Sequence, residues 1–432
     1  MSLKSHIARE VIHDAVSRNV DNIMDRAISI PEDVPKIISL LGPRRAGKTS
    51  VCLQLIKKLR KTIPSDRLLY INFEDDRFFP PQLEDMDTLL QTYYSIFPEN
   101  KTQKVYFFFD EVQEIPYWEK FVRRLMDQEN CRIYLTGSSS KLLSREIATT
   151  LRGRTLSFEI FPLSFGEYLS FNQLSFNPNS SSGKSFLQNN FEKYFWQGGF
   201  PELIYLPERL HLPTINEYIN LMLYRDLTER YGVRNPQLLK YLMKYSLTNL
   251  ANPLSVNKTF NDLKSQGYKV SKNTIYEYLS YLEEAFILYR ATRWSTSIRQ
   301  EAINPIKLYG VDQGFKYAMT GRRDEGRVLE NMVYMGLRRN AFEPKYLLLE
   351  QEVDFFIEDK FLVNVCYDLD DFDTKKREFD GLNEAMRFTD QKASFLVTMY
   401  EEGEEKLENG TVHIVPARNF LLDVQGYVGA FD

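Results

Sequence analysis

Short apolar runs alternate with segments of helical periodicity over the N-terminal part of the chain. The runs predict strands, and apolar residues at intervals of three and four predict the helices between them. The predicted strands cover residues 36–41, 68–73, 105–109, 132–136 and 155–161. Apolar strands that alternate with helices are typical of a parallel sheet covered on both faces. A helical pattern over 5–28, followed by Pro31, predicts an N-terminal helical arm over residues 1–30.

Three further parts follow the predicted sheet. After a loop-like stretch at 172–185, helical periodicity over 186–231 predicts a helical lid or linker that spans residues 171–235. Residues 236–315 contain helical pieces that are broken near Pro253 and Gly267. Short strands return in residues 316–432, together with one helical stretch, and this mixture predicts a C-terminal α/β domain.

Composition narrows the class of protein. The chain of 432 residues carries 55 basic and 59 acidic residues, a net charge of −4, which excludes a globally basic nucleic-acid coat but not a local basic face. Its cysteines, Cys52, Cys131 and Cys366, lie far apart and predict neither a disulfide framework nor a zinc site. That usage suits a reducing cytosol. The sequence has no signal-peptide pattern and no run of about 18 uncharged apolar residues, so we expect a cytoplasmic protein without a membrane segment.

A phosphate-binding loop follows the first predicted strand. The stretch GPRRAGKT fits the pattern G-x-x-x-x-G-K-[ST] in full. Its glycines let backbone N–H groups face phosphates, Lys48 places a cation beside the β- and γ-phosphates of ATP, and the Thr49 hydroxyl can bind Mg²⁺. The following helix adds its positive N-terminal end. The alternative is a tight turn with an incidental Lys-Thr. The candidate nucleotide-binding residues are Gly42, Pro43, Arg44, Arg45, Ala46, Gly47, Lys48, Thr49 and Ser50.

An acidic pair ends the third predicted strand. Asp110 and Glu111 follow the apolar run VYFFF. Asp110, at the end of a buried strand beside the phosphate loop, can hold Mg²⁺, and Glu111 can polarise an attacking water. The alternative is a helix or turn start, where Asp is common. The strand predicted over 68–73 lies between the phosphate-loop strand and this one. That insertion, together with Glu111, resembles the P-loop branch that hydrolyses ATP with a catalytic glutamate.

Polar and basic residues follow the fourth predicted strand. Ser138 either hydrogen-bonds the attacking water or the γ-phosphate, or caps the next predicted helix. Arg152 and Arg154 are candidates for a positive finger on the γ-phosphate, which accelerates hydrolysis by ~10³–10⁵-fold, and a surface salt bridge is the alternative for each. Arg44 and Arg45, inside the loop itself, are candidates for contact with phosphate or a partner.

Longer stretches carry a resemblance to a known family. They read GPRRAGKT, FFDEVQ, LTGSSSKLL, LRGRTLSFEIFPLSFGEYL and WQGGFPE, the last of which ends at Glu202. The marks continue in KLY at 307–309 with Asp312, LEN at 329–331 and EVDF at 352–355. With these marks the chain resembles, over nearly its whole length, a family of archaeal and bacterial AAA+-like P-loop ATPases.

The resemblance implies both a fold and an activity. The fold is α/β: a P-loop NTPase core of the ASCE/AAA+-like type with a parallel sheet over 31–170, a helical lid over 171–235, a winged-helix domain over 236–315, and a restriction-endonuclease-like α/β domain (DUF4143-type) over 316–432. The activity is ATP binding and hydrolysis.

The C-terminal domain departs from the pattern that nuclease activity requires. Members of the family with an intact nuclease site carry Glu-x-Lys on the strand after an Asp. Here Asp354 is present and Glu330 can supply a carboxylate, but Asn364 and Cys366 stand at the matching place. Phosphodiester cleavage needs carboxylates to hold Mg²⁺, so we expect no nuclease activity.

A basic segment points to DNA as a partner. Residues 236–300 hold nine basic and four acidic residues, a local excess of +5. The helix that begins near Lys272 looks like the second helix of a helix-turn-helix, which enters a DNA major groove. Lys272 and Asn273 would lie at its leading end, with Arg290 and Arg293 near the wing. The alternative is a winged helix that binds protein and packs on the ATPase.

These observations predict a Mg²⁺-dependent ATPase whose nucleotide state controls a DNA-binding winged-helix domain. The alternative is a slow, nucleotide-dependent regulatory scaffold that switches protein partners without binding DNA. If Arg152 or Arg154 senses the γ-phosphate of a neighbouring subunit, the protein is a homo-oligomer. An ATP-powered nuclease is disfavoured by Asn364 and Cys366.

Overall fold

The computed structural model describes the chain except residues 1–2, 139–150, 152, 175–179, 359 and 430–432. It divides into two compact units, Met1–Phe161 and Pro162–Asp432. Among the described residues, no helix is both long and apolar enough to cross a lipid bilayer.

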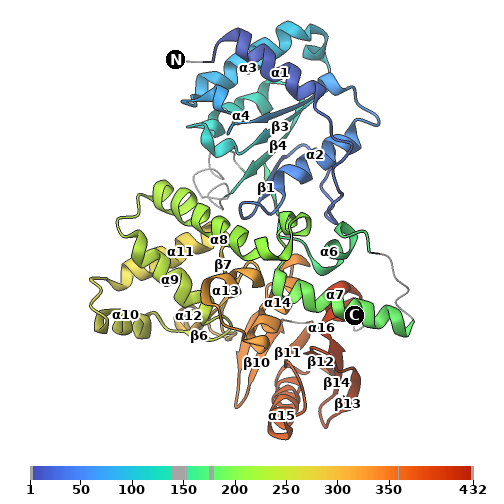
Figure 1. Cartoon of the computed structure of the whole chain (residues 1–432), viewed down its shortest axis with the longest axis vertical. Helices are drawn as coiled ribbons and strands as arrows, with labels where there is room; N and C mark the ends of the chain where they lie inside the picture. The colour runs from blue at the N-terminus through green and yellow to red at the C-terminus, as the bar shows by residue number, and fades with distance from the viewer. Residues whose placement is uncertain (1–2, 139–150, 152, 175–179, 359, 430–432) are drawn as a thin grey trace. The chain divides into compact units, whose positions relative to one another are not determined.

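The first unit is built on a five-stranded parallel sheet (Figure 1). The strand order is β2-β3-β4-β1-β5, so β4 separates the strand before the phosphate loop from the strand that ends in the acidic pair. The expected parallel sheet is therefore confirmed. Because its strands are parallel, their carboxyl ends all lie at the same edge of the sheet. The strands are β1 (Ile37–Leu41), β2 (Leu68–Asn72), β3 (Val105–Asp110), β4 (Cys131–Gly137) and β5 (Thr155–Glu159).

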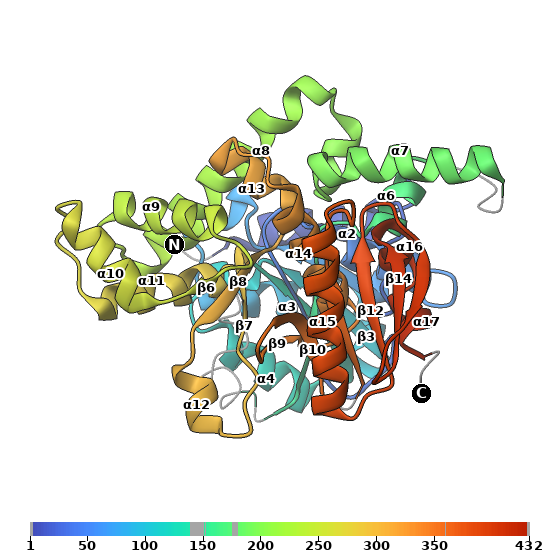
Figure 2. The same ribbon diagram turned by 90° about the horizontal axis from the view of Figure 1, so that it is seen from below.

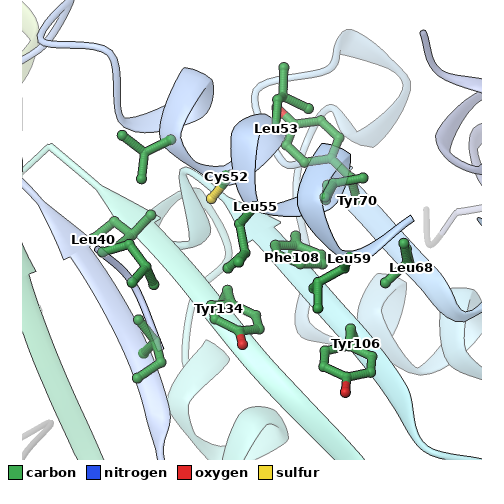
Figure 3. Close-up of a cluster of buried hydrophobic side chains, with 14 of the residues drawn as sticks. Leu40, Cys52, Leu53, Leu55, Leu59, Leu68, Tyr70, Tyr106, Phe108 and Tyr134 are labelled. Carbon is green, nitrogen blue, oxygen red and sulfur yellow. The ribbon is translucent and has the colours of Figure 1, made fainter. Parts of the chain in front are cut away.

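Helices cover both faces of this sheet. Alternate residues of β3 point to opposite faces, so Phe108 packs beneath α2 while Phe107 and Phe109 face α3 and α4. Figure 3 shows the α2 side, where Leu55 lies against Tyr134 and Phe108. The helices are α1 (Ser5–Ser17), α2 (Lys48–Leu59), α3 (Leu83–Ile96) and α4 (Trp118–Gln128), with 3₁₀ turns at Ser65–Arg67, Asp76–Phe78, Pro98–Thr102 and Val112–Glu114.

The helix predicted over 5–28 was too long. Helix α1 ends at Ser17, and the backbone turns to an extended conformation at Arg18, with ψ of 127°. Residues 18–30 form an irregular segment. From here on, the arm means this segment and not the whole range 1–30. Its apolar residues Val20 and Ile30 are buried in the core under α2, so their spacing reflects packing of an extended chain and not a helical face.

The second unit begins with helices and a small sheet. The order α9, β6, α10, α11, β7, β8 builds a three-stranded antiparallel sheet, β6-β8-β7, beside three helices. The breaks predicted near Pro253 and Gly267 both separate helices here. The elements up to β8 are α6 (Phe165–Phe171), α7 (Ser181–Gln197), 3₁₀ turns at Pro201–Tyr205 and Glu208–Leu210, α8 (His211–Leu221), the π-helix η8 (Met222–Glu229), α9 (Pro236–Thr248), β6 (Pro253–Leu254), α10 (Val256–Ser265), α11 (Lys272–Glu284), β7 (Leu288–Ala291), α12 (Ile298–Ile303) and β8 (Ile306–Gly310).

A mixed six-stranded sheet forms the rest of the second unit. Its order is β13-β14-β12-β11-β10-β9, with parallel pairing among β11, β12 and β14. Helix α15 lies along one face (Figure 2), and α14 and α16 contact the other. The elements are α13 (Gln313–Thr320), α14 (Glu325–Arg339), β9 (Lys345–Leu348), β10 (Glu352–Ile357), β11 (Phe361–Val365), α15 (Phe372–Thr389), β12 (Ala393–Thr398), β13 (Gly403–Lys406), β14 (Thr411–Pro416), α16 (Ala417–Leu422) and α17 (Val424–Gly429).

A buried carboxylate explains the first of the two paired glycines in the WQGGFPE stretch. Asp312 accepts hydrogen bonds from the backbone N–H of Gly199 at 2.7 Å and of Gly314 at 2.8 Å. Gly198 has φ of +86°, and a Cβ there would lie 2.1 Å from Asp312 Oδ1. Burial raises the pKa of Asp312 to about 6, although the two N–H groups oppose the shift. Gly198 therefore leaves room for the buried Asp312 carboxylate, and Gly199 donates a backbone N–H to it.

Candidate functional site

The phosphate loop joins the end of β1 to the start of α2. Gly42 has φ of +147°, and a Cβ there would lie 2.1 Å from the carbonyl oxygen of Ile160, so only glycine fits. Gly47 caps α2 in a left-handed conformation with φ of 97°, which directs the chain into the helix. The loop thus runs directly into the N-terminal end of α2, where the free backbone N–H groups give the helix its partial positive charge.

Lys48 and Thr49 open helix α2 beside the acidic pair. Lys48 is buried, and its Nζ donates to the carbonyl oxygens of Gly42 and Pro43, each at 3.1 Å. The same Nζ lies 3.8 Å from Glu111 Oε1. The Thr49 hydroxyl donates to Asp110 Oδ2 at 2.8 Å. The structure therefore brings the two ends of the predicted site together, although they are separated by 61 residues of chain.

Three hydroxyl groups hold the buried Asp110 carboxylate. Besides Thr49, Tyr70 of β2 donates to Oδ2 at 2.5 Å, and Thr136 of β4 donates to Oδ1. Burial raises the pKa of Asp110, while the hydrogen bonds from Thr136, Tyr70 and Thr49 oppose the shift. Burial and the negative charge of Asp110 together raise the pKa of Tyr70. The carboxylate is thus fixed from β2, β4 and α2 at once.

Glu111 leaves the strand in an unusual backbone conformation. Its φ is 51°, in the left-handed region, and its N–H donates to Thr136 Oγ1 at 2.9 Å. Gln113 Nε2 donates to Glu111 Oε2 at 2.5 Å, which orients the carboxylate. The strained turn directs the Glu111 side chain toward Lys48, at the carboxyl edge of the sheet.

The other predicted loop residues have distinct surroundings. Arg44 is buried and pairs with Glu74, which follows β2, at 2.9 Å. Arg45 is exposed, with φ of 65°. The carbonyl oxygen of Ala46 accepts from Arg26 of the arm at 2.7 Å, and Ser50 lies in the first turn of α2.

Sequence reasoning missed the residues that support the acidic pair. Tyr70 and Thr136 come from neighbouring strands, and their alignment with Asp110 depends on the parallel register, in which Phe109 lies opposite Leu135. That register was the available signal, because it places Thr136 beside Asp110. Nothing in the sequence pattern pointed to Arg26.

The structure describes two of the three site residues that were predicted after β4. Ser138 is buried immediately after the strand. Arg152 lies outside the described residues, as do residues 139–150, which include the helix predicted after Ser138. Arg154 pairs with Asp127, and its carbonyl oxygen accepts from Ile37 at the start of β1. Arg154 therefore lies at the sheet edge opposite the phosphate loop and does not reach the loop of its own chain.

The donor set at the acidic pair fits Mg²⁺. The Thr49 hydroxyl and the Asp110 carboxylate are hard oxygen ligands, the kind this cation prefers, and they already lie 2.8 Å apart beside the phosphate loop.

The residues considered for DNA contact lie on α11 and beside β7. Lys272 and Asn273 are exposed in the first turn of α11, and Lys272 Nζ lies 5.7 Å from the centroid of the Phe260 ring. Arg290 is exposed and pairs with Glu283 at 2.7 Å, and Arg293 donates to a backbone carbonyl. The leading end of α11 is thus open to solvent, whereas both arginines are already engaged.

A second polar cluster lies where the two sheets of the second unit meet. Lys307 of β8 is buried, and its Nζ lies 3.0 Å from Glu330, 2.7 Å from Glu352 and 3.3 Å from Asp354. Burial opposes the charge on Lys307, but the three carboxylates overcome it and raise the pKa of this lysine. Burial, together with the charge of Asp354, raises the pKa of Glu330 to about 8.

The two residues that replace the expected Glu-x-Lys are also engaged. Asn364 accepts from the backbone N–H of Asp354 at 3.1 Å and donates to Glu378 at 2.7 Å. Cys366 follows the end of β11, with its sulfur 2.8 Å from the carbonyl oxygen of Asp368. A cation does lie beside Asp354, but it is Lys307, which comes from another sheet.

Two family models match the chain. An AAA domain model matches residues 34–169, and a domain of unknown function, DUF8612, matches residues 188–326. The first match covers the parallel sheet with the phosphate loop and the acidic pair.

Relatives match over most of their length. The uncharacterized protein MJ1544 of Methanocaldococcus jannaschii is 36% identical over 91% of this chain and 90% of its own. An uncharacterized protein of Haemophilus influenzae is 30% identical over 78% of this chain and 82% of its own. Among solved structures, the ORC1 protein of Aeropyrum pernix in complex with DNA is 12% identical, with 74% of this chain and 92% of that chain covered and a TM-score of 0.29.

Proposed function

The chain belongs to the same family as the MJ1544 protein and contains an AAA domain, and from this premise we propose that it binds and hydrolyses ATP. The observation that carries the proposal is the convergence of Lys48, Thr49, Asp110 and Glu111 at one edge of the sheet. Each of these groups has a defined task in phosphoryl transfer to water.

The loop and its lysine bind the triphosphate. The backbone N–H groups of the loop and the N-terminal end of α2 attract phosphate oxygens, and Lys48 adds a full positive charge. Because Lys48 Nζ now rests on two loop carbonyls, it is already held above the loop where the β- and γ-phosphates would lie. Thr49 and Asp110 would hold Mg²⁺, which neutralises the charge that develops on the phosphates.

Glu111 orients and polarises the attacking water. Its carboxylate is held by Gln113 and lies near Lys48, so a water bound to it faces the γ-phosphate position. The Thr136 hydroxyl accepts a hydrogen bond from the Glu111 N–H and donates one to the Asp110 carboxylate. This one hydroxyl therefore holds the base and the metal ligand in fixed positions relative to each other.

Two substitutions separate binding from turnover. Lys48→Ala should abolish ATP binding, measured by fluorescence of a labelled ATP analogue. Glu111→Gln should retain ATP binding and reduce steady-state phosphate release by at least ~100-fold, the usual contribution of a general base. Equal hydrolysis by Glu111→Gln and the wild type would refute the assignment of Glu111.

The second unit is the proposed receiver of the nucleotide state. The order of helices and strands from α9 to β8 supports a winged-helix domain, with α11 as the helix that enters a DNA major groove. Its open leading end, Lys272 and Asn273, favours contact with DNA. Binding should weaken steeply with salt, because phosphate contacts release counterions.

The test of DNA binding uses fluorescence anisotropy with and without a non-hydrolysable ATP analogue. Lys272→Ala should lower the affinity and flatten the salt slope, whereas Lys392→Ala, at an exposed pair elsewhere in the unit, should do neither. If the wild type hydrolyses ATP yet shows no salt-dependent binding to any duplex, the regulatory scaffold without DNA binding is the function that remains.

A role for Arg154 requires a second copy of the chain. Since Arg154 lies at the opposite sheet edge from its own phosphate loop, we propose that it acts only on the nucleotide of a neighbouring subunit. Specific activity should then rise with protein concentration, and Arg154→Ala should remove the rise. Activity that is independent of concentration would exclude this arrangement.

A further inference from the structure

We infer that Arg26 is a positioning residue that holds the phosphate loop in its binding conformation and fastens the arm to it. The inference rests on the proposed binding of ATP at this loop. Arg26 lies 20 residues before the loop carbonyl that it contacts and is 7% exposed.

Arg26 joins the loop to the segment after β5. Its Nη1 donates to the carbonyl oxygen of Ala46 at 2.7 Å, and its Nη2 donates to that of Phe161 at 2.8 Å. The preceding residue, Ile160, packs its backbone against Gly42 at the other end of the loop. The Ile160 N–H donates to the carbonyl oxygen of Leu41 at 2.6 Å. One guanidinium thus bridges the last turn of the loop and the backbone that packs against its first residue.

The backbone of Arg26 is itself fixed by helix α2. Gln54 accepts from the Arg26 N–H at 2.8 Å and donates to the Arg26 carbonyl at 3.1 Å. Two further side chains hold the arm: Lys57 of α2 donates to Ile23 at 3.0 Å, and Arg60, at the C-terminal end of α2, donates to Arg18 at 2.7 Å. The arm therefore runs along the very helix whose N-terminus forms the phosphate site.

The contact matters because the peptide between Ala46 and Gly47 must turn its N–H group, and not its carbonyl oxygen, toward the anion. A carbonyl oxygen turned toward a triphosphate repels it, whereas the N–H of the next residue attracts it. Arg26 gives the Ala46 carbonyl a charged partner on the outer side of the loop, immediately before Gly47 reverses the backbone. Without this partner the Ala46–Gly47 peptide is free to rotate, and the loop loses part of its preorganisation.

The test compares Arg26→Ala with Arg60→Ala in the full chain. Both variants remove an arginine that donates to two backbone carbonyls, but only Arg26 contacts the phosphate loop. Arg26→Ala should weaken the affinity for ATP by about tenfold or more, as expected for a lost charged hydrogen bond, while Arg60→Ala should stay within about twofold. Arg26→Lys, which can reach one carbonyl, should recover part of the loss.

Two readouts separate positioning of the loop from a general loss of stability. The Kd for pyrophosphate should rise by the same factor as the Kd for ATP, because the loop contacts only phosphate groups. Amide hydrogen exchange of residues 42–47 without nucleotide should accelerate in Arg26→Ala and not in Arg60→Ala. If Arg26→Ala does not fold, Gln54→Met, which releases only the backbone of Arg26, should show the same exchange pattern in weaker form.

The inference and the proposed function fail in different ways. A wild type that binds neither ATP nor pyrophosphate overturns the proposed function, and the exchange comparison still decides the role of Arg26. Unchanged loop exchange and unchanged pyrophosphate affinity in Arg26→Ala would overturn the inference, as would an equal effect of Arg60→Ala.

Discussion

Replacing Lys307 by Met should destabilise the second unit, and more so at high pH. The substitution removes a buried cation from between three carboxylates, those of Glu330, Glu352 and Asp354. Removing one partner of a buried ion pair costs about 3–5 kcal/mol, because the other partner stays buried without compensation. Lys307 compensates several groups, so we expect a loss of about 5 kcal/mol at pH 8.

The pH dependence follows from the carboxyl groups. In the wild type the pKa of Glu330 is raised to about 8, so the folded state keeps a proton that the unfolded state loses above its ordinary pKa, and stability falls as pH rises toward 8. Burial already raises the pKa of Glu352, and without the opposing positive charge of Lys307 that pKa should rise further, so Glu352 should also take up a proton as pH falls. Each pH unit below 8 then reduces the cost of the substitution by about 1.4 kcal/mol, to about 2 kcal/mol at pH 6.

Urea unfolding followed by tryptophan fluorescence measures this effect, since Trp294 packs against Phe356 and Phe388 of the same unit. Lys392→Met is the matched control: its partner Asp390 is exposed, and such surface pairs contribute at most about 1 kcal/mol. A loss for Lys307→Met no greater than that of the control, or a greater loss at pH 6 than at pH 8, would refute the reasoning.

Three further predictions concern buried polar groups and backbone. Tyr70→Phe should lower the free energy of unfolding by about 1–3 kcal/mol in chemical denaturation, because Asp110 loses a buried donor; no loss would mean that solvent replaces the hydroxyl. Gly198→Ala should lower the thermal midpoint far more than Gly267→Ala, because both have positive φ but only Gly198 would clash with Asp312, and equal shifts would dismiss the clash. Because the pKa of Asp312 is raised to about 6, the wild type should lose up to about 3 kcal/mol of stability as pH rises from 4 to 7, and Asp312→Asn should lose less; identical pH profiles would contradict the raised pKa.

The sequence predicted most where the determining residues are neighbours in the chain. The phosphate loop needs only its own glycines, lysine and threonine, and the apolar strands around it specify a parallel sheet. Asp110 and Glu111 were found because they end a strand whose burial is visible in the pattern. Their distance from Lys48 follows from the topology, since the carboxyl ends of parallel strands share one edge.

Residues whose roles depend on distant partners escaped prediction. The periodicity of 5–28 fits a helix, yet Val20 is buried on an extended arm whose backbone groups are satisfied by side chains of α2. Lys307 could not be matched to Asp354 because they come from different sheets. Thr136 was overlooked in favour of Ser138 because the choice depends on strand register.

The backbone at Glu111 has a consequence for engineering. A residue other than glycine held at φ of 51° is strained by about 1–3 kcal/mol, and glycine at this position would relieve that strain. Selection of variants for heat resistance alone would therefore enrich glycine at position 111 and discard the carboxylate. Under the proposed role of Glu111 in hydrolysis, thermal robustness and turnover are in opposition at this residue, so a stabilisation campaign must keep position 111 fixed and seek its gains elsewhere.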